Sequence, residues 1–289
     1  MKRLLLLLAT IFILHPALHA QTSPRVAIVL SGGGALGYAH IGALQALDEA
    51  GIRPTFIAGT SMGAIVGAVY AQGYSADQLF HFVVSRHLHS ARRNVHASLR
   101  HANQGIGSYK HVRQLLNDAI PHDSFDSLAI PFLCVATNIR TGTPEVRTSG
   151  SHLADWVLAS ASIPVVFKPQ LIDGDYYCDG GFVDNLPACH VPSSAYDILI
   201  AIDLVPSHMP PSNDYFTLDY MVHDIYGNMI LDINSTSGRQ CCHHIIRPHL
   251  DVRYGILDFH RYKELRQRGY EAMQLWLQSH PEVIPKKDK

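Results

Sequence analysis

The N-terminus of this sequence lacks an apolar run long enough to cross a bilayer as a helix, which takes roughly 20 residues. The run that is present, Leu4 to Leu14, follows Lys2 and Arg3 and precedes Ala17-Leu18-His19-Ala20. This order of basic, apolar and small residues is typical of a secretory signal peptide. We predict that residues 1–20 are removed, with a retained anchor as the alternative, and that the protein is exported to the periplasm or medium of a bacterium. There is no cysteine near the predicted cleavage site, so the sequence gives no indication of lipoprotein processing.

Charge is also scarce, because 16% of the residues are charged and 47% are hydrophobic. Such a composition is typical of a chain with a sizeable core. Loss of residues 1–20 would leave 21 Lys and Arg against 24 Asp and Glu, a balance that does not favour a nucleic acid partner. No Pro/Ser/Gly-rich linker or internal repeat divides the chain, so we predict one domain over residues 21–284 and a disordered tail over 285–289.

Cysteine is infrequent, and its number is odd. The five cysteines all follow residue 20, and at least one thiol must be free: they are Cys134, Cys178, Cys189, Cys241 and Cys242. Adjacent cysteines such as Cys241 and Cys242 would form a strained ring if bridged to each other, so each needs another partner or none. A metal site formed by this pair with His243 and His244 is the alternative. We predict no metal, because these residues form one short run and no HExxH pattern occurs.

Apolar runs of strand length alternate with amphipathic segments of helix length. Strands are expected at residues 25–30, 55–58, 131–136 and 198–204. Helices are expected at residues 38–50, 62–72, 76–86, 110–120 and 153–160, with a last amphipathic helix for packing at 258–277. This alternation predicts an α/β fold with a mainly parallel central sheet and helices on both faces.

A glycine-rich turn, Ser31-Gly32-Gly33-Gly34-Ala35-Leu36-Gly37, leaves the first expected strand and enters a helix. Bare backbone and the free amides at a helix start favour a negative charge at this position. Gly32, Gly34 and Gly37 also match the spacing of a dinucleotide-binding turn. That interpretation requires an acidic residue at the end of the second strand, and none is present there. A purely structural tight turn is the other alternative.

A second turn, Gly59-Thr60-Ser61-Met62-Gly63, has the pattern G-x-S-x-G between an expected strand and an expected helix. Gly59 and Gly63 permit the sharp bend that exposes a serine hydroxyl above a sheet. On its own the pattern is a weak signal, because a serine at this position can simply cap the following helix. Its position beside the first turn favours Ser61 as a nucleophile.

A serine hydroxyl needs a base to react at neutral pH. The candidate base is Asp179, which is followed by Gly180 and Gly181. Taken by itself, an Asp-Gly pair most often marks a turn.

Together the three segments resemble the patatin-like phospholipase family, over roughly residues 25–203. SGGGALG is similar to its oxyanion loop, GTSMG to its nucleophile elbow and DGG to its general-base motif, in the family's order. Residues 158–167 and Asn185-Leu186-Pro187 are similar to the segments on either side of the DGG motif. One departure is Leu36, where family members often have Arg or Lys.

The resemblance implies a patatin-like three-layer α/β sandwich and a lipid acyl hydrolase of the phospholipase A type. Ser61 would be the nucleophile, Asp179 the general base and acid, and the backbone amides of Gly32, Gly33 and Gly34 the oxyanion hole. It implies no metal or cofactor. The partner would be a lipid or other acyl ester, met at a membrane surface. Leu36 would remove a side-chain contribution to anion binding.

Two other functions remain open from the sequence. One is an esterase with a Ser-His-Asp triad, in which Asp179 or Asp203 would act with a later histidine such as His223 or His249. The other is an exported lipid-binding protein on the same scaffold without catalysis. A dyad needs Asp179 and no histidine, a triad needs both, and a binding protein needs neither.

Overall fold

The computed structural model describes residues 24–85, 110–164, 166–205, 221–250 and 254–285. The predicted signal peptide, residues 1–20, lies outside these ranges, as do residues 286–289 of the predicted tail. Among the helices within these ranges, none is long and apolar enough to cross a membrane.

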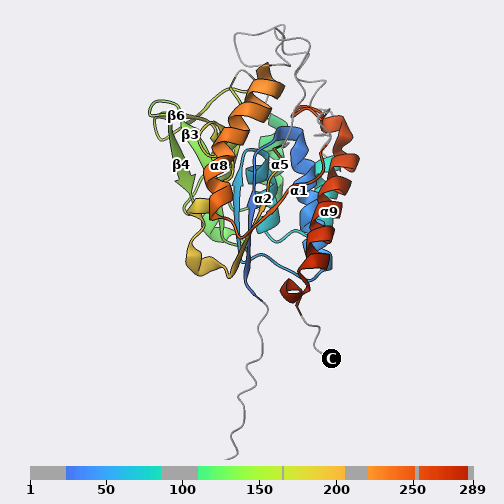
Figure 1. Ribbon diagram of the computed structural model, residues 1–289. Helices are drawn as coiled ribbons and strands as arrows, with labels where there is room; N and C mark the ends of the chain where they lie inside the picture. Colours follow the sequence, from blue (N-terminus) through green and yellow to red (C-terminus); the bar gives the residue numbers. More distant parts are fainter. Residues whose placement is uncertain (1–23, 86–109, 165, 206–220, 251–253, 286–289) are drawn as a thin grey trace, which may run out of the picture.

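In this part of the chain, one sheet of eight strands forms the centre of the molecule (Figure 1). The strands are β1 (Val26–Leu30), β2 (Phe56–Thr60), β3 (Phe132–Asn138), β4 (Thr143–Arg147), β5 (Gln170–Ile172), β6 (Asp175–Asp179), β7 (Ile198–Ile202) and β8 (His244–Ile246). Their order is β5-β6-β3-β2-β1-β7-β8, with β4 also paired to β3. The run from β3 to β8 is parallel, which confirms the predicted mainly parallel sheet.

The central strand β1 explains why an uninterrupted apolar run predicted this sheet. Ile28 and Leu30 pack into the hydrophobic core on one face, whereas Ala27 and Val29 pack into a second core on the other. A parallel strand covered on both faces has no exposed side and therefore shows no alternation with polar residues. The four predicted strands correspond to β1, β2, β3 and β7, with ends that differ by up to two residues.

Strands β2 and β6 pair with successive parts of the same edge of β3, β2 in parallel and β6 in antiparallel orientation. β2 pairs with the first part of β3, ending at Thr60 opposite Val135. β6 pairs with the last part, beginning at Asp179 opposite Ala136. Both parts of β3 also pair with β4, so β4 occupies the opposite edge. The ends of β2 and β6 therefore meet at consecutive positions of one strand.

Helices cover both faces of the sheet, as predicted: α1 and α9 lie side by side on one side, and α8 on the other (Figure 1). The α-helices are α1 (Tyr38–Glu49), α2 (Met62–Ala71), α3 (Ala76–Ser85), α5 (Lys110–Ala119), α6 (Leu153–Ser160), α8 (Leu231–Cys241) and α9 (Tyr262–Ser279). A π-helix, Met221–Ile230, leads directly into α8. All six predicted helices are confirmed, and the last begins at Tyr262, after a 3-10 turn at Phe259–Arg261.

Glycines bring α1 and α9 into backbone contact. A β-carbon at Gly42 of α1 would lie 1.8 Å from the Arg266 carbonyl oxygen, and one at Gly269 of α9 would lie 1.8 Å from the Ala39 carbonyl oxygen. No side chain fits between the two helices at these positions. The C-terminal helix is thus part of the core packing, which is the role predicted for it.

A disulfide between Cys189 and Cys241 joins the end of α8 to the 3-10 turn Ala188–His190. Cys241 is therefore not available as a thiolate ligand, and the described residues contain no group of three or more potential metal ligands. The alternative of a metal site at Cys241 to His244 therefore loses one of its four candidate ligands. The thiols of Cys134, Cys178 and Cys242 are free.

We expect the Cys189→Ser/Cys241→Ser double variant to unfold more easily than the wild type. The bridge closes a separation of 52 residues, which in the chain-entropy model corresponds to about 4 kcal/mol of stability. Urea denaturation without added oxidant or reductant measures the difference in the free energy of unfolding.

A Cys242→Ser variant is the matched control, because it changes the neighbouring free thiol and leaves the bridge intact. Its stability should still fall on addition of dithiothreitol, whereas that of the double variant should not. Equal stability of the wild type and the double variant without reductant would contradict the role of the bridge.

Candidate active site

Ser61 lies at the sharp bend between β2 and α2. Its backbone has φ 56° and ψ −122°, a conformation that a non-glycine residue rarely adopts. The bend is possible because Gly59 and Gly63, two positions to either side, have no side chain. A β-carbon at Gly63 would lie 2.2 Å from the Leu30 carbonyl oxygen, and one at Gly59 would lie 2.4 Å from the Gly63 carbonyl oxygen. The pattern G-x-S-x-G thus reflects contacts that no side chain could make.

The Ser61 hydroxyl donates a hydrogen bond to Asp179 Oδ2 at 2.7 Å. Ser61 follows Thr60 at the end of β2, and Asp179 ends β6, so the shared edge of β3 brings the two residues together. Ser61 is 4% exposed and Asp179 is fully buried. The two residues chosen from separate sequence motifs are therefore in direct contact.

The environment of Asp179 makes it a better base than an ordinary carboxylate. Burial raises its pKa to about 6, against the opposing effects of hydrogen bonds from the Ser61 hydroxyl, the Gly181 amide and the Tyr226 hydroxyl. The Gly181 amide donates to Oδ1 at 2.9 Å. Desolvation disfavours the charged form more than these donors stabilise it. Asp179 therefore binds a proton at a higher pH than an ordinary carboxylate does.

The loop Gly32–Gly34 lies against Ser61, but its three amides are not equivalent. A β-carbon at Gly32 would lie 3.1 Å from Ser61 Cβ. The Gly32 amide donates to the Asn185 carbonyl at 3.2 Å. Within the described residues, the amides of Gly33 and Gly34 donate to no acceptor. The sequence predicted all three as anion donors, and the geometry leaves two of them open.

A buried histidine, His40, forms a hydrogen bond to the residue that precedes this loop. His40 Nε2 lies 2.8 Å from the Ser31 carbonyl oxygen, which can only accept, so the ring is protonated at Nε2. Burial lowers the pKa of His40 to about 4, against opposing effects of the Ser31 carbonyl and Asp203. His40 is thus a neutral donor that fixes the loop. Leu36 is buried in the hydrophobic core instead of contributing a polar group.

The other motif glycines also lie at close contacts around the two residues. A β-carbon would lie 2.1 Å from Met62 Cγ at Gly37, 2.2 Å from the Val135 carbonyl oxygen at Gly180, and 2.5 Å from Leu231 Cδ2 at Gly181. At Gly180 the obstacle is backbone, whereas at Gly37 and Gly181 it is the side chain of Met62 or Leu231, which would have to move. Their role is to let the three segments approach one another.

Several residues that hold the site were missed from the sequence. Asn234 Nδ2 donates to the Gly181 carbonyl at 2.9 Å, and Ser235 Oγ accepts from Asn185 Nδ2 at 3.0 Å. The ring of Tyr226 stacks on Phe182, with centroids 4.6 Å apart. These residues belong to the π-helix and α8, a region where the sequence contains no recognisable motif. Only Asn185 gave a signal, since it follows the DGG motif.

Two of the residues proposed for a histidine triad, Asp203 and His249, form no described hydrogen bond with Ser61. Asp203 is buried and accepts from Arg239 Nε at 2.8 Å and Arg247 Nε at 3.1 Å. His249 is exposed, and the side chain of His223 lies outside the described part of the structure. Among the described residues, no histidine bonds to Ser61 or Asp179.

Comparison with known proteins shows to which family this chain belongs. The family model described as patatin-like phospholipase matches residues 28–190, which contain the glycine loop, Ser61 and Asp179. The chain belongs to the patatin-like phospholipase family. The family resemblance seen in the sequence is therefore confirmed.

Individual relatives match part of the chain. An uncharacterized NTE family protein of Mycobacterium tuberculosis is 37% identical over 194 residues, which cover 67% of this chain and 53% of that protein. A protein of Pyricularia oryzae named lysophospholipase NTE1 is 32% identical over 182 residues, 62% of this chain and 12% of that protein. The chain thus spans about half the length of the mycobacterial relative.

Among solved structures, VipD from Legionella pneumophila superposes with a TM-score of 0.52 at 16% identity, covering 89% of this chain and 67% of VipD. At this identity the likeness concerns the fold alone. It agrees with the α/β three-layer sandwich predicted from the sequence.

Ser160 offers a test of how the turn at Ser61 is held. Its hydroxyl, which is fully buried, accepts from the Ser61 amide at 2.9 Å. We expect Ser160→Ala to lower the free energy of unfolding by about 1–3 kcal/mol, because it leaves a buried donor unpaired. Urea denaturation followed by circular dichroism measures the change.

Ser162→Ala is the matched control. The Ser162 hydroxyl, equally buried, donates to the Leu158 carbonyl, which also accepts from the Ala161 amide. Its removal therefore leaves no orphaned group and should cost less. If the two variants were equally stable, the Ser160 bond would not support the turn.

Proposed function

We propose that this protein is a carboxylic ester hydrolase that removes acyl groups from lipids by means of a Ser61/Asp179 dyad. The observation that carries the proposal is the 2.7 Å hydrogen bond from the Ser61 hydroxyl to Asp179 in a buried site. Family membership supports a lipid as substrate, and some relatives are named lysophospholipases.

In the first half of the reaction, Ser61 Oγ attacks the ester carbonyl carbon while its proton passes to Asp179. The carbonyl oxygen becomes an oxyanion that the open amides of Gly33 and Gly34 can stabilise. Collapse of this intermediate breaks the bond to the alcohol oxygen, which takes the proton from Asp179. The products are a free alcohol and an acyl group on Ser61.

In the second half, water attacks the acyl carbon and gives its proton to Asp179. The oxyanion that forms in this step accepts hydrogen bonds from the same Gly33 and Gly34 amides. Its collapse breaks the bond to Ser61 Oγ, which recovers the proton from Asp179 and releases the carboxylic acid. Neither half requires a histidine, and every residue named returns to its starting state.

The same proposal places the enzyme outside the cytoplasm, acting on lipid at a membrane surface. The order of residues in 1–20 favours export. The Cys189–Cys241 bridge supports it, because disulfides persist mainly in oxidising compartments. N-terminal sequencing of native protein should begin near Gln21, and a sequence that begins at Met1 would contradict removal of a signal peptide.

The dyad is tested by Asp179→Asn, which keeps the shape of the side chain and removes its ability to accept a proton. We expect kcat/KM on a soluble acyl ester to fall by at least ~100-fold, as for the loss of a general base. Ser61→Ala should abolish turnover and also labelling by a fluorophosphonate. Thermal melting checks that both variants are folded.

The controls are His223→Gln and His249→Gln, which remove the candidate bases of a triad. Under the dyad both should retain nearly full activity. A histidine variant as inactive as Ser61→Ala would support a triad instead, since members of such a unit fail together. Lipid binding without any turnover by the wild type would identify a non-catalytic binding protein.

The pH dependence provides an independent test of the base. Asp179 accepts a proton only when it is ionised, and its pKa is about 6. We therefore expect kcat/KM to fall about tenfold per pH unit as the pH drops below 6, and to level off above it. A series of stopped assays from acid to neutral pH measures the curve.

In Asp179→Asn the residual rate should lose this acidic limb, because the titrating group is gone. A limb that persists unchanged in the variant would assign the titration to another residue.

A further inference from the structure

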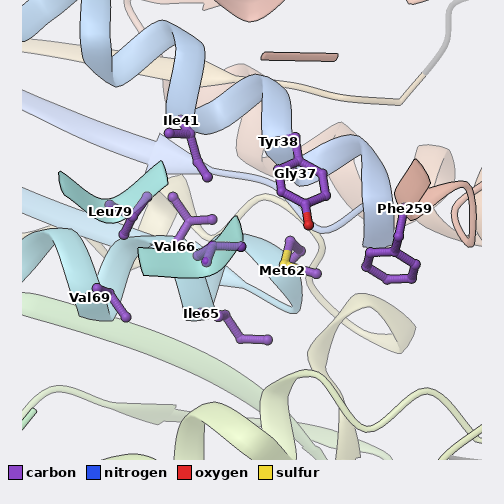
Figure 2. Close-up of a pocket in the computed structure, with 10 residues that line it drawn as sticks. Gly37, Tyr38, Ile41, Met62, Ile65, Val66, Val69, Leu79 and Phe259 are labelled. Atoms are coloured by element: carbon purple, nitrogen blue, oxygen red, sulfur yellow. The ribbon is translucent and has the colours of Figure 1, made fainter. Parts of the chain in front are cut away.

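The glycine loop that follows β1 is held at both ends against the rest of the site. Near its start, the Gly32 amide donates to the Asn185 carbonyl at 3.2 Å. At its end, Gly37 lies against Met62, the residue after Ser61 (Figure 2). A β-carbon at Gly37 would lie 2.1 Å from Met62 Cγ, so the contact is close. The position of the loop relative to Ser61 is therefore fixed by its two ends.

Between these ends, the peptide unit that joins Gly32 to Gly33 is oriented by a side chain. The Ser31 hydroxyl donates to the Gly32 carbonyl at 3.0 Å, and the described part of the chain offers this carbonyl no other hydrogen bond. The unit before it is held by His40, whose ring donates to the Ser31 carbonyl at 2.8 Å. The unit after it is held by the backbone, since the Leu36 amide donates to the Gly33 carbonyl at 3.1 Å. Of these three units, the middle one is thus the one that a hydroxyl orients.

The Ser31 hydroxyl is itself fixed by the segment that follows β7. Ser31 is fully buried, and its oxygen accepts from the Leu204 amide at 2.9 Å. A hydroxyl has a single proton to donate, and here that proton goes to the Gly32 carbonyl. The Leu204 side chain also lies at the loop, because a β-carbon at Gly33 would be 3.3 Å from Leu204 Cβ. Leu204 therefore sets the direction in which Ser31 donates.

The hydrogen bond from Ser31 determines where the Gly33 amide points, because a peptide unit is planar. The described residues contain no cis peptide bond, and in a trans unit the carbonyl and the amide point to opposite sides. With the Gly32 carbonyl held toward Ser31, the Gly33 amide points to the other side, where it has no acceptor among the described residues. Glycine on both sides of the unit offers little resistance to rotation. Without the hydroxyl, the unit can turn over and withdraw the amide.

We infer that Ser31 is a positioning residue, whose hydroxyl keeps the Gly33 amide directed at the oxyanion. The inference rests on the proposed function, because it assumes that an oxyanion forms at Ser61. Ser31 acts through the Gly32 carbonyl and does not itself contact the substrate. The first residue of the segment SGGG therefore has a role in the reaction that differs from the role of its glycines.

The test is steady-state kinetics of Ser31→Ala with p-nitrophenyl butanoate. Both halves of the proposed reaction form an oxyanion, so kcat should fall whichever half is slower. We expect a fall of about 10- to 100-fold, because complete loss of one oxyanion donor costs about 100- to 1,000-fold and the freed peptide unit still points the amide correctly part of the time. KM should change by less than about twofold, since the amide acts on the transition state and not on the bound ester.

Thr55→Val is the matched control, because it removes a hydroxyl that also donates to a backbone carbonyl, that of Ala195 at 2.7 Å. Thr55 precedes β2, at the opposite end of that strand from Ser61, so kcat and KM should equal those of the wild type. Ser31→Cys is a second variant, which nearly keeps the size of the side chain but weakens its hydrogen bond. It should lose kcat in the same way, and it replaces Ser31→Ala if thermal melting shows that the alanine variant does not fold.

Crystal structures of the wild type and of a folded Ser31 variant measure the orientation of the peptide unit without any turnover. We expect the Gly32 carbonyl of the variant to have turned over in at least part of the molecules. If it turns over but the wild type hydrolyses no ester, the proposed function fails and the orienting role of Ser31 stands. The inference is overturned if the carbonyl keeps its direction, or if an active wild type and the variant differ in kcat by less than about twofold.

Discussion

The contact between Ser61 and Asp179 depends on how β3 shares one edge between two strands. β2 ends at Thr60, and β6 takes over the same edge one position later, at Asp179. A parallel strand delivers the hydroxyl and an antiparallel strand delivers the carboxylate. Any slip of β6 by one residue would turn Asp179 to the other face of the sheet and break the contact.

Hydrogen bonds near the ends of β2 and β6 help to hold this register. The Thr137 hydroxyl donates to the Asp179 carbonyl at 2.7 Å, and the Thr60 hydroxyl donates to the Asp184 carbonyl at 2.9 Å. These bonds join β3 to β6 and β2 to the loop after β6 inside the protein. The first bond fixes the backbone of Asp179, and the second fixes the loop that follows it.

Local motifs explain why much of the site could be predicted from the sequence. The glycines around Ser61 and Asp179 are required by contacts within a few ångströms of those residues, so the chemistry leaves a local pattern. Asn234, Ser235 and Tyr226 act from a distant part of the chain through single hydrogen bonds or a ring contact. Such contacts produce no recognisable spacing of residues in the sequence.

Two further features were missed for other reasons. His40 lies in an apolar helix, where its ring resembles an ordinary core residue. The pairing of Cys189 with Cys241 could not be chosen from an odd set of five cysteines.

The α8 helix limits where the chain can be truncated. The family model ends at residue 190, yet β7, which pairs with the central strand β1, and α8, which holds the loop of Gly181, both follow that point. A fragment cut at the end of the matched region would expose an edge of β1 and release the loop that carries the carboxylate. The three motifs therefore occupy less of the chain than the structure that holds them together, and the folding unit extends at least to α9, whose backbone touches α1.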